Sequence, residues 1–249
     1  MKIIVIAAGS GKRVGEKTKN FPKYLLNVNG KTIQQHQLSV FKKFNYDEII
    51  VITGPHKEKF TSDEFTYVED VKYHNHDVLG SLMEARKYIS GDVIIIYSDI
   101  IFDDKILSQM IETNTEIGIA VDLDWEKKYI GRTEHPKTEA DNVLLNNQKN
   151  IKKIKKNIVK DSKSIIGEFI GIMKLSAKGS KIFVDKYVEL EKNNPKNFHN
   201  STSFEKAYLT DMLQDLIDNK IPVTPIFING KWCEIDTMQD LNIASQLFN

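Results

Sequence analysis

The residues best suited to chemistry stand near the amino terminus, in a segment that contains two glycines. Residues 3–6 are apolar and β-branched, which predicts a buried strand over residues 2–6. Two glycines in the segment that follows permit a tight turn in which the backbone approaches a ligand closely. Free N–H groups in such a loop, beside two cations, suit a polyphosphate. The candidate phosphate-binding residues are Ala7, Ala8, Gly9, Ser10, Gly11, Lys12 and Arg13.

This glycine pattern also has an ordinary interpretation as a turn from a strand to a helix, because a lone G-x-G sequence is common there. Val14 stands where the Rossmann fingerprint has its third glycine, and no G-K-[ST] sequence of a Walker loop is present. Lys23, which follows Pro22, adds a further cation near the loop.

Two aspartates occupy positions that suit a metal ion. Asp99 ends the strongest predicted strand, residues 92–99, and Asp236 ends the last one, residues 231–236. If both lie near the glycine loop, their oxygens suit Mg²⁺ bound to a triphosphate. The alternatives are an Asx turn at Asp99 and a helix N-cap at Asp236, and spacing alone favours the cap.

Aromatic and acidic residues of the second half could line a pocket for a second substrate. Aromatic faces and carboxylates together attract an amine or ammonium group, although ordinary packing explains each aromatic residue singly. These residues are Asp122, Trp125, Tyr129, Glu168 and Trp232. The lysine-rich residues 152–163 are best explained as the solvated side of a strand, from which one lysine could reach phosphate. We expect Cys233 to be a buried thiol, and no third ligand is spaced to complete a zinc site with His74 and His76.

Strands and helices alternate through the first 100 residues, which predicts βαβ units and a doubly wound α/β sheet. We predict strands over 47–53, 65–70, 71–74, 92–99, 116–122, 150–158, 164–174, 223–228 and 231–236, and helices over 31–45, 80–89, 176–191, 203–219 and 238–248. Ligands of such sheets bind at the carboxyl ends of the strands, where the glycine loop and Asp99 fall. We expect one domain over residues 1–249, in which residues 120–175 form an inserted β-rich wall.

Composition limits the partners. The 249 residues carry 35 Lys and Arg against 34 Asp and Glu, and this balance argues against general binding to nucleic acid or membranes. The single cysteine excludes an internal disulfide and fits a reducing compartment. No apolar run approaches the length of a membrane span, and a strand that begins at residue 2 leaves no room for a signal peptide. We therefore expect a soluble, cytoplasmic protein, either a monomer or a homodimer.

The sequence IAAGSGKR…PKYLL resembles the signature of nucleotidyltransferases of the sugar-phosphate and choline-phosphate type. YSDIIFD and CEIDT resemble the two metal-aspartate motifs of that superfamily, which reverses the cap interpretation of Asp236. The resemblance implies a Rossmann-like fold, with a mixed, mostly parallel sheet flanked by helices and a small β-rich insert that binds the acceptor. LGSLMEA stands where the superfamily contacts base and ribose, which points to Gly80 and Ser81. Val14 and Gly15 depart from the leucine and proline common after the arginine.

The middle of the chain is similar to a narrower branch. VDLDWEKKYIGRTEHPKTEADNV, GEFIGIMKLS and KAYLTDMLQDLI resemble the cytidylyltransferases of phosphonate biosynthesis. Relatives of that branch activate 2-aminoethylphosphonate, phosphocholine or, for bacterial capsules, phosphoglutamine. The resemblance implies CTP and a small phosphate or phosphonate as substrates and Mg²⁺, with Mn²⁺ as an alternative, as the metal.

The resemblance also implies roles for single residues. Arg13 would hold pyrophosphate, Lys23 would bind the acceptor phosphate, and Lys156 would be the lysine of the branch that precedes NI. Arg132 is assigned to the acceptor set, although fixing a hairpin is a slightly better explanation for it and for His135 and Glu139. The alternatives are a sugar-1-phosphate nucleotidyltransferase and a glycosyltransferase, for which DLD at 122–124 is the only formal metal motif, and a nucleotide sensor without activity.

Overall fold

The central strand of the fold is the first one, and it separates two hydrophobic clusters. The computed structural model describes residues 1–9, 21–159, 164–193 and 195–249. In β1 (Lys2–Ala7), Ile4 and Ile6 face one cluster, whereas Ile3 and Val5 face the other. Successive side chains of a strand point to opposite faces, so a continuous apolar run predicts burial on both sides.

Nine strands of the described residues form one mixed sheet. Its order is β10-β9-β11-β6-β1-β4-β5, and β8 branches from β11 and pairs with β12. The pairings from β6 to β5 are parallel, as is β8 with β12, whereas β11 is antiparallel to β6, β8 and β9. The remaining bounds are β4 (Glu48–Thr53), β5 (Thr66–Glu69), β6 (Val93–Tyr97), β8 (Ile117–Asp122), β9 (Asp141–Leu145), β10 (Ile151–Lys156), β11 (Ile165–Leu175) and β12 (Thr224–Phe227).

Two short ladders complete the strands. β7 (Ile100–Phe102) pairs antiparallel with β13 (Trp232–Glu234), and β2 (Asn27–Val28) pairs with β3 (Lys31–Thr32). The first of these ladders joins a segment directly after β6 to a segment near the carboxyl end of the sequence.

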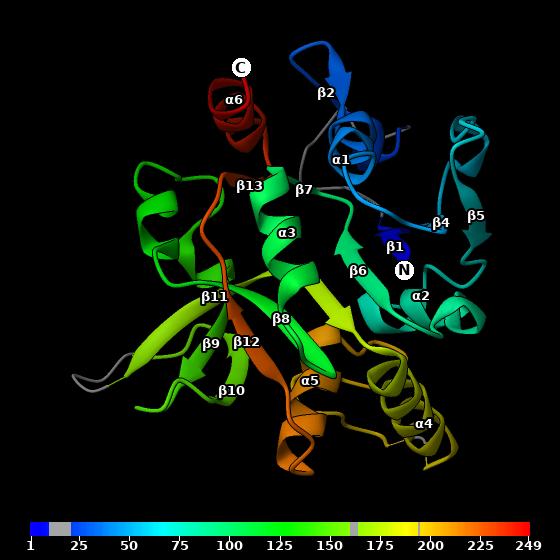
Figure 1. The fold of residues 1–249 in the computed structure, drawn as a ribbon, viewed down its shortest axis with the longest axis vertical. Coiled ribbons are helices and arrows are strands. Elements are labelled where there is room, and N and C mark those ends of the chain that lie inside the picture. Colours follow the sequence, from blue (N-terminus) through cyan, green and yellow to red (C-terminus); the bar gives the residue numbers. More distant parts are fainter. Residues whose placement is uncertain (10–20, 160–163, 194) are drawn as a thin grey trace.

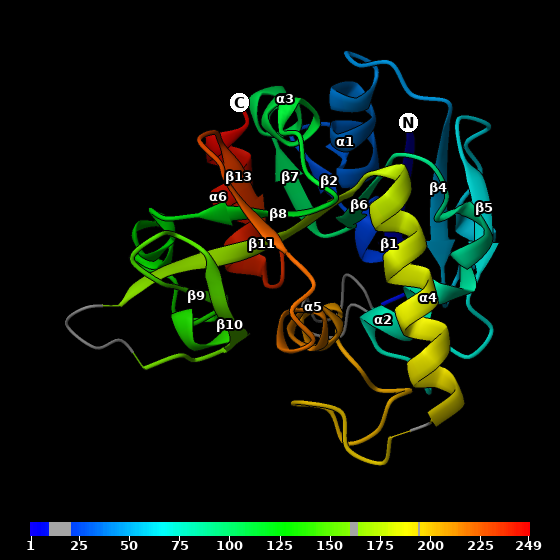
Figure 2. The ribbon, with the colours of Figure 1, turned by 60° about the horizontal axis from the view of Figure 1, so that its bottom comes forward.

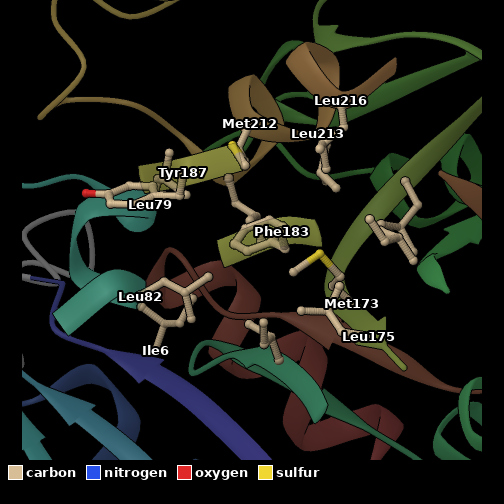
Figure 3. Close-up of a cluster of buried hydrophobic side chains, with 14 of the residues drawn as sticks. Ile6, Leu79, Leu82, Met173, Leu175, Phe183, Tyr187, Met212, Leu213 and Leu216 are labelled. Atoms are coloured by element: carbon tan, nitrogen blue, oxygen red, sulfur yellow. The ribbon is translucent and has the colours of Figure 1, made fainter. Parts of the chain in front are cut away.

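Helices cover both faces of the sheet (Figures 1 and 2). The cluster around Ile4 and Ile6 is covered by α2 (Val78–Glu84), α4 (Ala177–Asn193) and α5 (Leu209–Asp218). Figure 3 shows this side, where Leu79 and Leu82 lie with Phe183 and Met212. The opposite cluster is covered by α1 (Ile33–Phe41), α3 (Asp104–Glu112) and α6 (Met238–Leu247). In the parts of the chain that are described, no helix combines the length and the apolar character needed to cross a membrane.

The predicted class, a mixed α/β sheet flanked by helices, is confirmed. Several boundaries differ from the prediction. Residues 71–75 form a turn rather than a strand, because the side chain of Asp70 accepts a hydrogen bond from Lys72 N at 2.9 Å. Helix α5 begins at Leu209 rather than at residue 203. Strands β7 and β9 and helix α3 occupy stretches to which the sequence analysis assigns no element. Whether residues 120–175 act as an inserted wall stays a prediction.

Candidate active site

A cleft of about 940 Å³ opens at the carboxyl ends of β1, β4 and β6. Ala7 at the end of β1 lines it together with Ala8 and Gly9, and Asp99 lines it after β6. The backbone after β4 approaches closely, because a Cβ on Gly54 would lie 2.4 Å from Ala8 O. The volume is typical of small-molecule sites. The predicted phosphate contacts at Ser10, Gly11, Lys12 and Arg13 lie outside the described residues.

Lys23 lies between the two predicted metal aspartates. Its Nζ is 2.9 Å from Asp99 Oδ2 and also donates a hydrogen bond to Asp236 Oδ1, and the lysine is only 8% exposed. Burial acts to lower the pKa of Lys23, but the charges of Asp99 and Asp236 outweigh burial and raise the pKa above its ordinary value. The ammonium is therefore a permanent cation between two carboxylates.

A buried clamp holds Lys23 in place. Lys23 begins the 3-10 turn Lys23–Leu25, and its neighbour Tyr24 donates a hydrogen bond to Gln37 Oε1 at 2.9 Å. Gln37 Nε2 in turn donates to Tyr97 O at 3.0 Å and to Ile100 O at 2.8 Å, on either side of Asp99. The lysine and Asp99 are thus fixed to one another through side chains that the solvent does not reach.

Asp236 is positioned from two sides. Beside it, Ile235 N donates to Asp99 O at 2.8 Å, so the β7–β13 ladder sets the spacing of the two aspartates. The N-cap of α6 is Thr237, with a capping box to Asp240, and the cap interpretation of Asp236 is therefore wrong. The side chain of Asp236 instead lines the cleft and forms an ion pair with Lys23.

Asp240 anchors this turn from behind. Its Oδ2 accepts hydrogen bonds from Asp236 N at 3.0 Å and Thr237 N at 2.9 Å, and Arg132 Nε donates to Oδ1 at 2.9 Å. Burial acts to raise the pKa of Asp240, but the hydrogen bond from His135 and the charge of Arg132 lower that pKa to about 2. Arg132 contacts Asp240 and is not among the described residues that line the cleft, and its role toward an acceptor stays a prediction.

The sequence analysis missed Glu234. Glu234 and Asp236 line the cleft together with His135, and one ligand atom from each of the three lies within 4.8 Å of the others. Burial, followed by the charges of Asp236 and Asp99, holds the pKa of Glu234 well above its ordinary value. The signal in the sequence was the two-residue period of Trp232, Glu234 and Asp236, which places all three on one face.

The donor set fits a hard divalent cation. Asp99 Oδ1 is buried and has no hydrogen-bond partner within the described chain, so it has a free position for a ligand. Asp99, Glu234 and Asp236 offer oxygens only, which Mg²⁺ prefers, whereas the imidazole of His135 is not a typical Mg²⁺ ligand. An oxygen site built on Asp99 and Asp236 therefore agrees better with Mg²⁺ than the cluster that includes His135.

The opposite end of the cleft lies between β4 and α2. Ser81 lines it, as do Pro55, His56, Tyr73 and His76. Gly80 is not among the described lining residues; it packs against His76, because a Cβ there would lie 2.7 Å from the ring. Lys156, at the end of β10, also lines the cleft and forms an ion pair with Glu139 at 3.0 Å.

The predicted acceptor residues divide into two layers. Glu168 and Trp232 line the cleft, whereas Asp122, Trp125 and Tyr129 are not among the described residues that do. Trp232 Nε1 donates to Asp122 Oδ2 at 2.7 Å, and Trp125 Nε1 donates to Ile166 O at 3.1 Å. The ring of Trp232 already has Lys128 Nζ 5.1 Å from its centroid, and the ring of Tyr129 has Arg132 at 4.7 Å. The roles of these residues toward an acceptor stay predictions.

Glu168 is an unusual carboxyl group. It is 2% exposed, its Oε1 accepts a hydrogen bond from Tyr129, and its Oε2 has no partner within the described residues. Burial raises the pKa of Glu168 to about 8, and Tyr129 only partly opposes this effect. Its Oε2 can take a ligand as partner in two ways: it donates a hydrogen bond while the carboxyl is protonated, and it accepts one from an N–H group when the carboxyl is ionised.

The raised pKa of Glu168 should make the stability of the folded chain depend on pH. Between its ordinary pKa of 4.5 and about 8, the folded chain retains a proton that the unfolded chain releases, so this group's contribution to stability falls as the pH rises. We expect Glu168→Gln to remove this part of the pH dependence in melting temperatures recorded across that range. Glu191→Gln, at a half-exposed position, should keep the wild-type slope. An unchanged slope in Glu168→Gln would contradict the prediction.

The cleft, with its buried lysine between two aspartates, lies in a fold that nucleotidyltransferases share. The chain belongs to the MobA-like NTP transferase family, whose model matches residues 3–136. The resemblance to nucleotidyltransferases inferred from the sequence is therefore confirmed.

Individual relatives extend the likeness over the whole chain. It is 27% identical over 256 residues to CTP:phosphoglutamine cytidylyltransferase of Campylobacter jejuni, a match that covers 98% of each protein. Its fold is similar to that of CTP:phosphocholine cytidylyltransferase from Streptococcus pneumoniae, with a TM-score of 0.72 and 20% identity over 100% of this chain and 99% of that one. The inositol-1-phosphate CTP transferase from T. maritima has a TM-score of 0.73 and 20% identity, with coverages of 99% and 95%.

Proposed function

We propose that this protein is a cytidylyltransferase that joins CTP to a small phosphate or phosphonate acceptor and releases pyrophosphate. The observation that carries the proposal is the buried Lys23, held between Asp99 and Asp236 beside the loop that follows β1. CTP is favoured over other triphosphates because the full-length relative and two structural relatives use it.

Asp99 and Asp236 would hold the metal ion, with Mg²⁺ as the candidate and Mn²⁺ as the alternative. When bound, such an ion neutralises phosphate charge and polarises the phosphorus that is attacked. Asp99 Oδ1 supplies the free oxygen for it, and the β7–β13 ladder keeps the two aspartates at a fixed spacing.

The chain's own residues would act by position and charge. The acceptor oxygen attacks the α-phosphorus of CTP, the new P–O bond forms, and the bond to pyrophosphate breaks with its electron pair on the leaving group. A phosphate or phosphonate oxygen is already anionic at neutral pH, so this attack requires no general base. Lys23 would hold the acceptor oxygen and the developing charge, while Arg13 would hold pyrophosphate. Lys156 would bind phosphate from the end of β10.

The acceptor is proposed to be small and to carry a nitrogen group. The faces of Trp232 and Tyr129 are already occupied by Lys128 and Arg132, which leaves the carboxyl of Glu168 as the group best suited to an amine or amide. Candidates of this kind include aminoethylphosphonate, phosphocholine and phosphoglutamine. Of these, phosphocholine has no N–H donor for Glu168.

A matrix of substrates tests the proposal. Each of CTP, UTP, ATP and GTP is combined with each member of a panel of amino-phosphonates, amino-phosphates and sugar 1-phosphates, and pyrophosphate is measured. We expect release with CTP and a nitrogen-bearing acceptor. Release with UTP and a sugar 1-phosphate would instead assign the chain to sugar nucleotide synthesis. CTP binding without release for any acceptor would support a sensor.

A further inference from the structure

We infer that Asp70 determines which base the nucleotide site prefers. It does so by holding His76 and Ser81 so that His76 Nε2 and Ser81 Oγ present hydrogen-bond acceptors to a ligand. The inference rests on the proposed function, because it assigns the base of the bound nucleotide to the end of the cleft near α2. Asp70 does not line the cleft itself among the described residues, so it acts as a positioning residue.

Asp70 is completely buried directly after β5, and its backbone N donates to Thr53 O at 2.8 Å. Its Oδ1 accepts from Lys72 N at 2.9 Å, and its Oδ2 accepts from Ser81 Oγ at 2.7 Å. His76 Nδ1 lies 3.0 Å from Oδ1 and 3.1 Å from Oδ2. Lys72 N and Ser81 Oγ both donate to carboxylate oxygens of Asp70, and the tautomer of His76 with its proton on Nδ1 completes the set of donors.

This arrangement fixes the polarity of two atoms at the cleft. The hydroxyl of Ser81 donates its hydrogen bond to Asp70, so toward the cleft Oγ can act only as an acceptor. The neutral tautomer of His76 that donates to Asp70 carries its proton on Nδ1, and in this tautomer Nε2 is an acceptor as well. Both residues line the cleft, and His76 Nε2 has no partner within the described part of the chain.

The ring of His76 has little freedom to change this arrangement. A Cβ on Gly80 would lie 2.7 Å from Cγ of His76 and 2.8 Å from Cδ2, so the ring is packed directly on the backbone of α2. Asp70 fixes its Nδ1 edge. Helix α2 is itself anchored in the hydrophobic cluster by Leu79 and Leu82 (Figure 3).

Two acceptors suit a base that presents an amino group. The triphosphate belongs near Lys23 and Asp99, and the end near α2, with Pro55 and Tyr73, is left for the base. Cytosine presents an exocyclic amino group, whereas uracil has a carbonyl oxygen at the same position. The carbonyl of uracil would face the lone pairs of Ser81 Oγ and His76 Nε2 without forming a hydrogen bond. Leaving these polar atoms unpaired in a buried site disfavours uracil strongly relative to cytosine.

Asp70→Asn tests this inference. Lys72 N requires an oxygen at the Oδ1 position, so the amide NH₂ of the variant lies toward Ser81 and His76 and donates to them. The Ser81 hydroxyl then becomes free to donate to the base. We expect wild-type protein to bind CTP about tenfold or more tightly than UTP, and the variant to lose about tenfold or more of this ratio. Calorimetry with each nucleotide and Mg²⁺ measures both affinities without an acceptor.

Two further variants make the result decisive. Asp211→Asn changes another completely buried aspartate, one that binds Ser201 and Tyr208 N, and should keep the wild-type ratio. His76→Phe removes one acceptor and should lower CTP affinity without improving UTP affinity. An unchanged ratio in Asp70→Asn would overturn the inference, as would an unchanged ratio in His76→Phe if Asp70→Asn does not fold. Equal wild-type affinities would overturn it while leaving the proposed function intact, whereas binding of neither nucleotide would overturn both.

Discussion

Lys23→Ala should lower the rate of pyrophosphate release by about 100-fold or more, while the chain remains folded. Lys23 is the cation that contacts both Asp99 and Asp236, so its loss leaves two carboxylates facing the anionic substrates. The hydrophobic clusters on both faces of the sheet do not include this residue, and the circular dichroism spectrum should therefore be retained. The rate is measured at saturating CTP and acceptor with Mg²⁺ present.

Lys42→Ala is the matched control for Lys23→Ala. Lys42 also forms an ion pair, with Glu64 at 2.6 Å, but its side chain is half exposed and it is not among the described residues that line the cleft. We expect wild-type turnover from this control, because surface ion pairs contribute little. Turnover near the wild-type rate in Lys23→Ala would exclude Lys23 from the reaction.

Asp236→Ala should nearly abolish turnover for a different reason. The substitution removes one of the two carboxylates proposed to hold the metal and leaves Lys23 paired with Asp99 alone. Helix α6 should persist, since its N-cap is Thr237. The loss should therefore appear in the rate, measured together with the thermal melt of the same preparation.

Thr237→Ala separates this role from that of a helix cap. Removing a threonine N-cap costs about 1 kcal/mol of stability on average, and turnover should remain within a few-fold of wild type. Asp236→Ala is thus expected to lose turnover and keep helix α6, whereas Thr237→Ala should keep turnover and lose stability. An active Asp236→Ala variant would disprove the proposed role of Asp236.

Much of the sheet was predictable because its central strands are continuous β-branched runs. β1, β4 and β6 are buried on both faces. Their sequences are continuous apolar runs, without alternating polar residues, and this pattern predicts such burial. β7 is only three residues long, and its pairing with β13 depends on a distant part of the chain. Such a ladder has no local signature that distinguishes it from a loop.

Motifs in the sequence point to some of the candidate site residues, whereas other features of the cleft depend on geometry alone. Asp99 and Asp236 stand in recognisable motifs. The burial of Asp70 and the free oxygen of Glu168 depend on neighbours far along the chain, which spacing does not reveal. The aromatic faces of Trp232 and Tyr129 show the same limit, because the lysine and arginine that occupy them became visible only in three dimensions.

The two ion pairs of Lys23 have a consequence for the order of folding. One partner is 76 residues away in sequence, whereas the other is 213 residues away. During synthesis, β1, β4 and β6 leave the ribosome well before β13, so a growing chain can assemble the middle of its sheet without the second carboxylate. The site is completed only when β13 docks on β7. With the role proposed for Asp236, a nascent chain that already has much of its sheet in register would stay inactive until this late step.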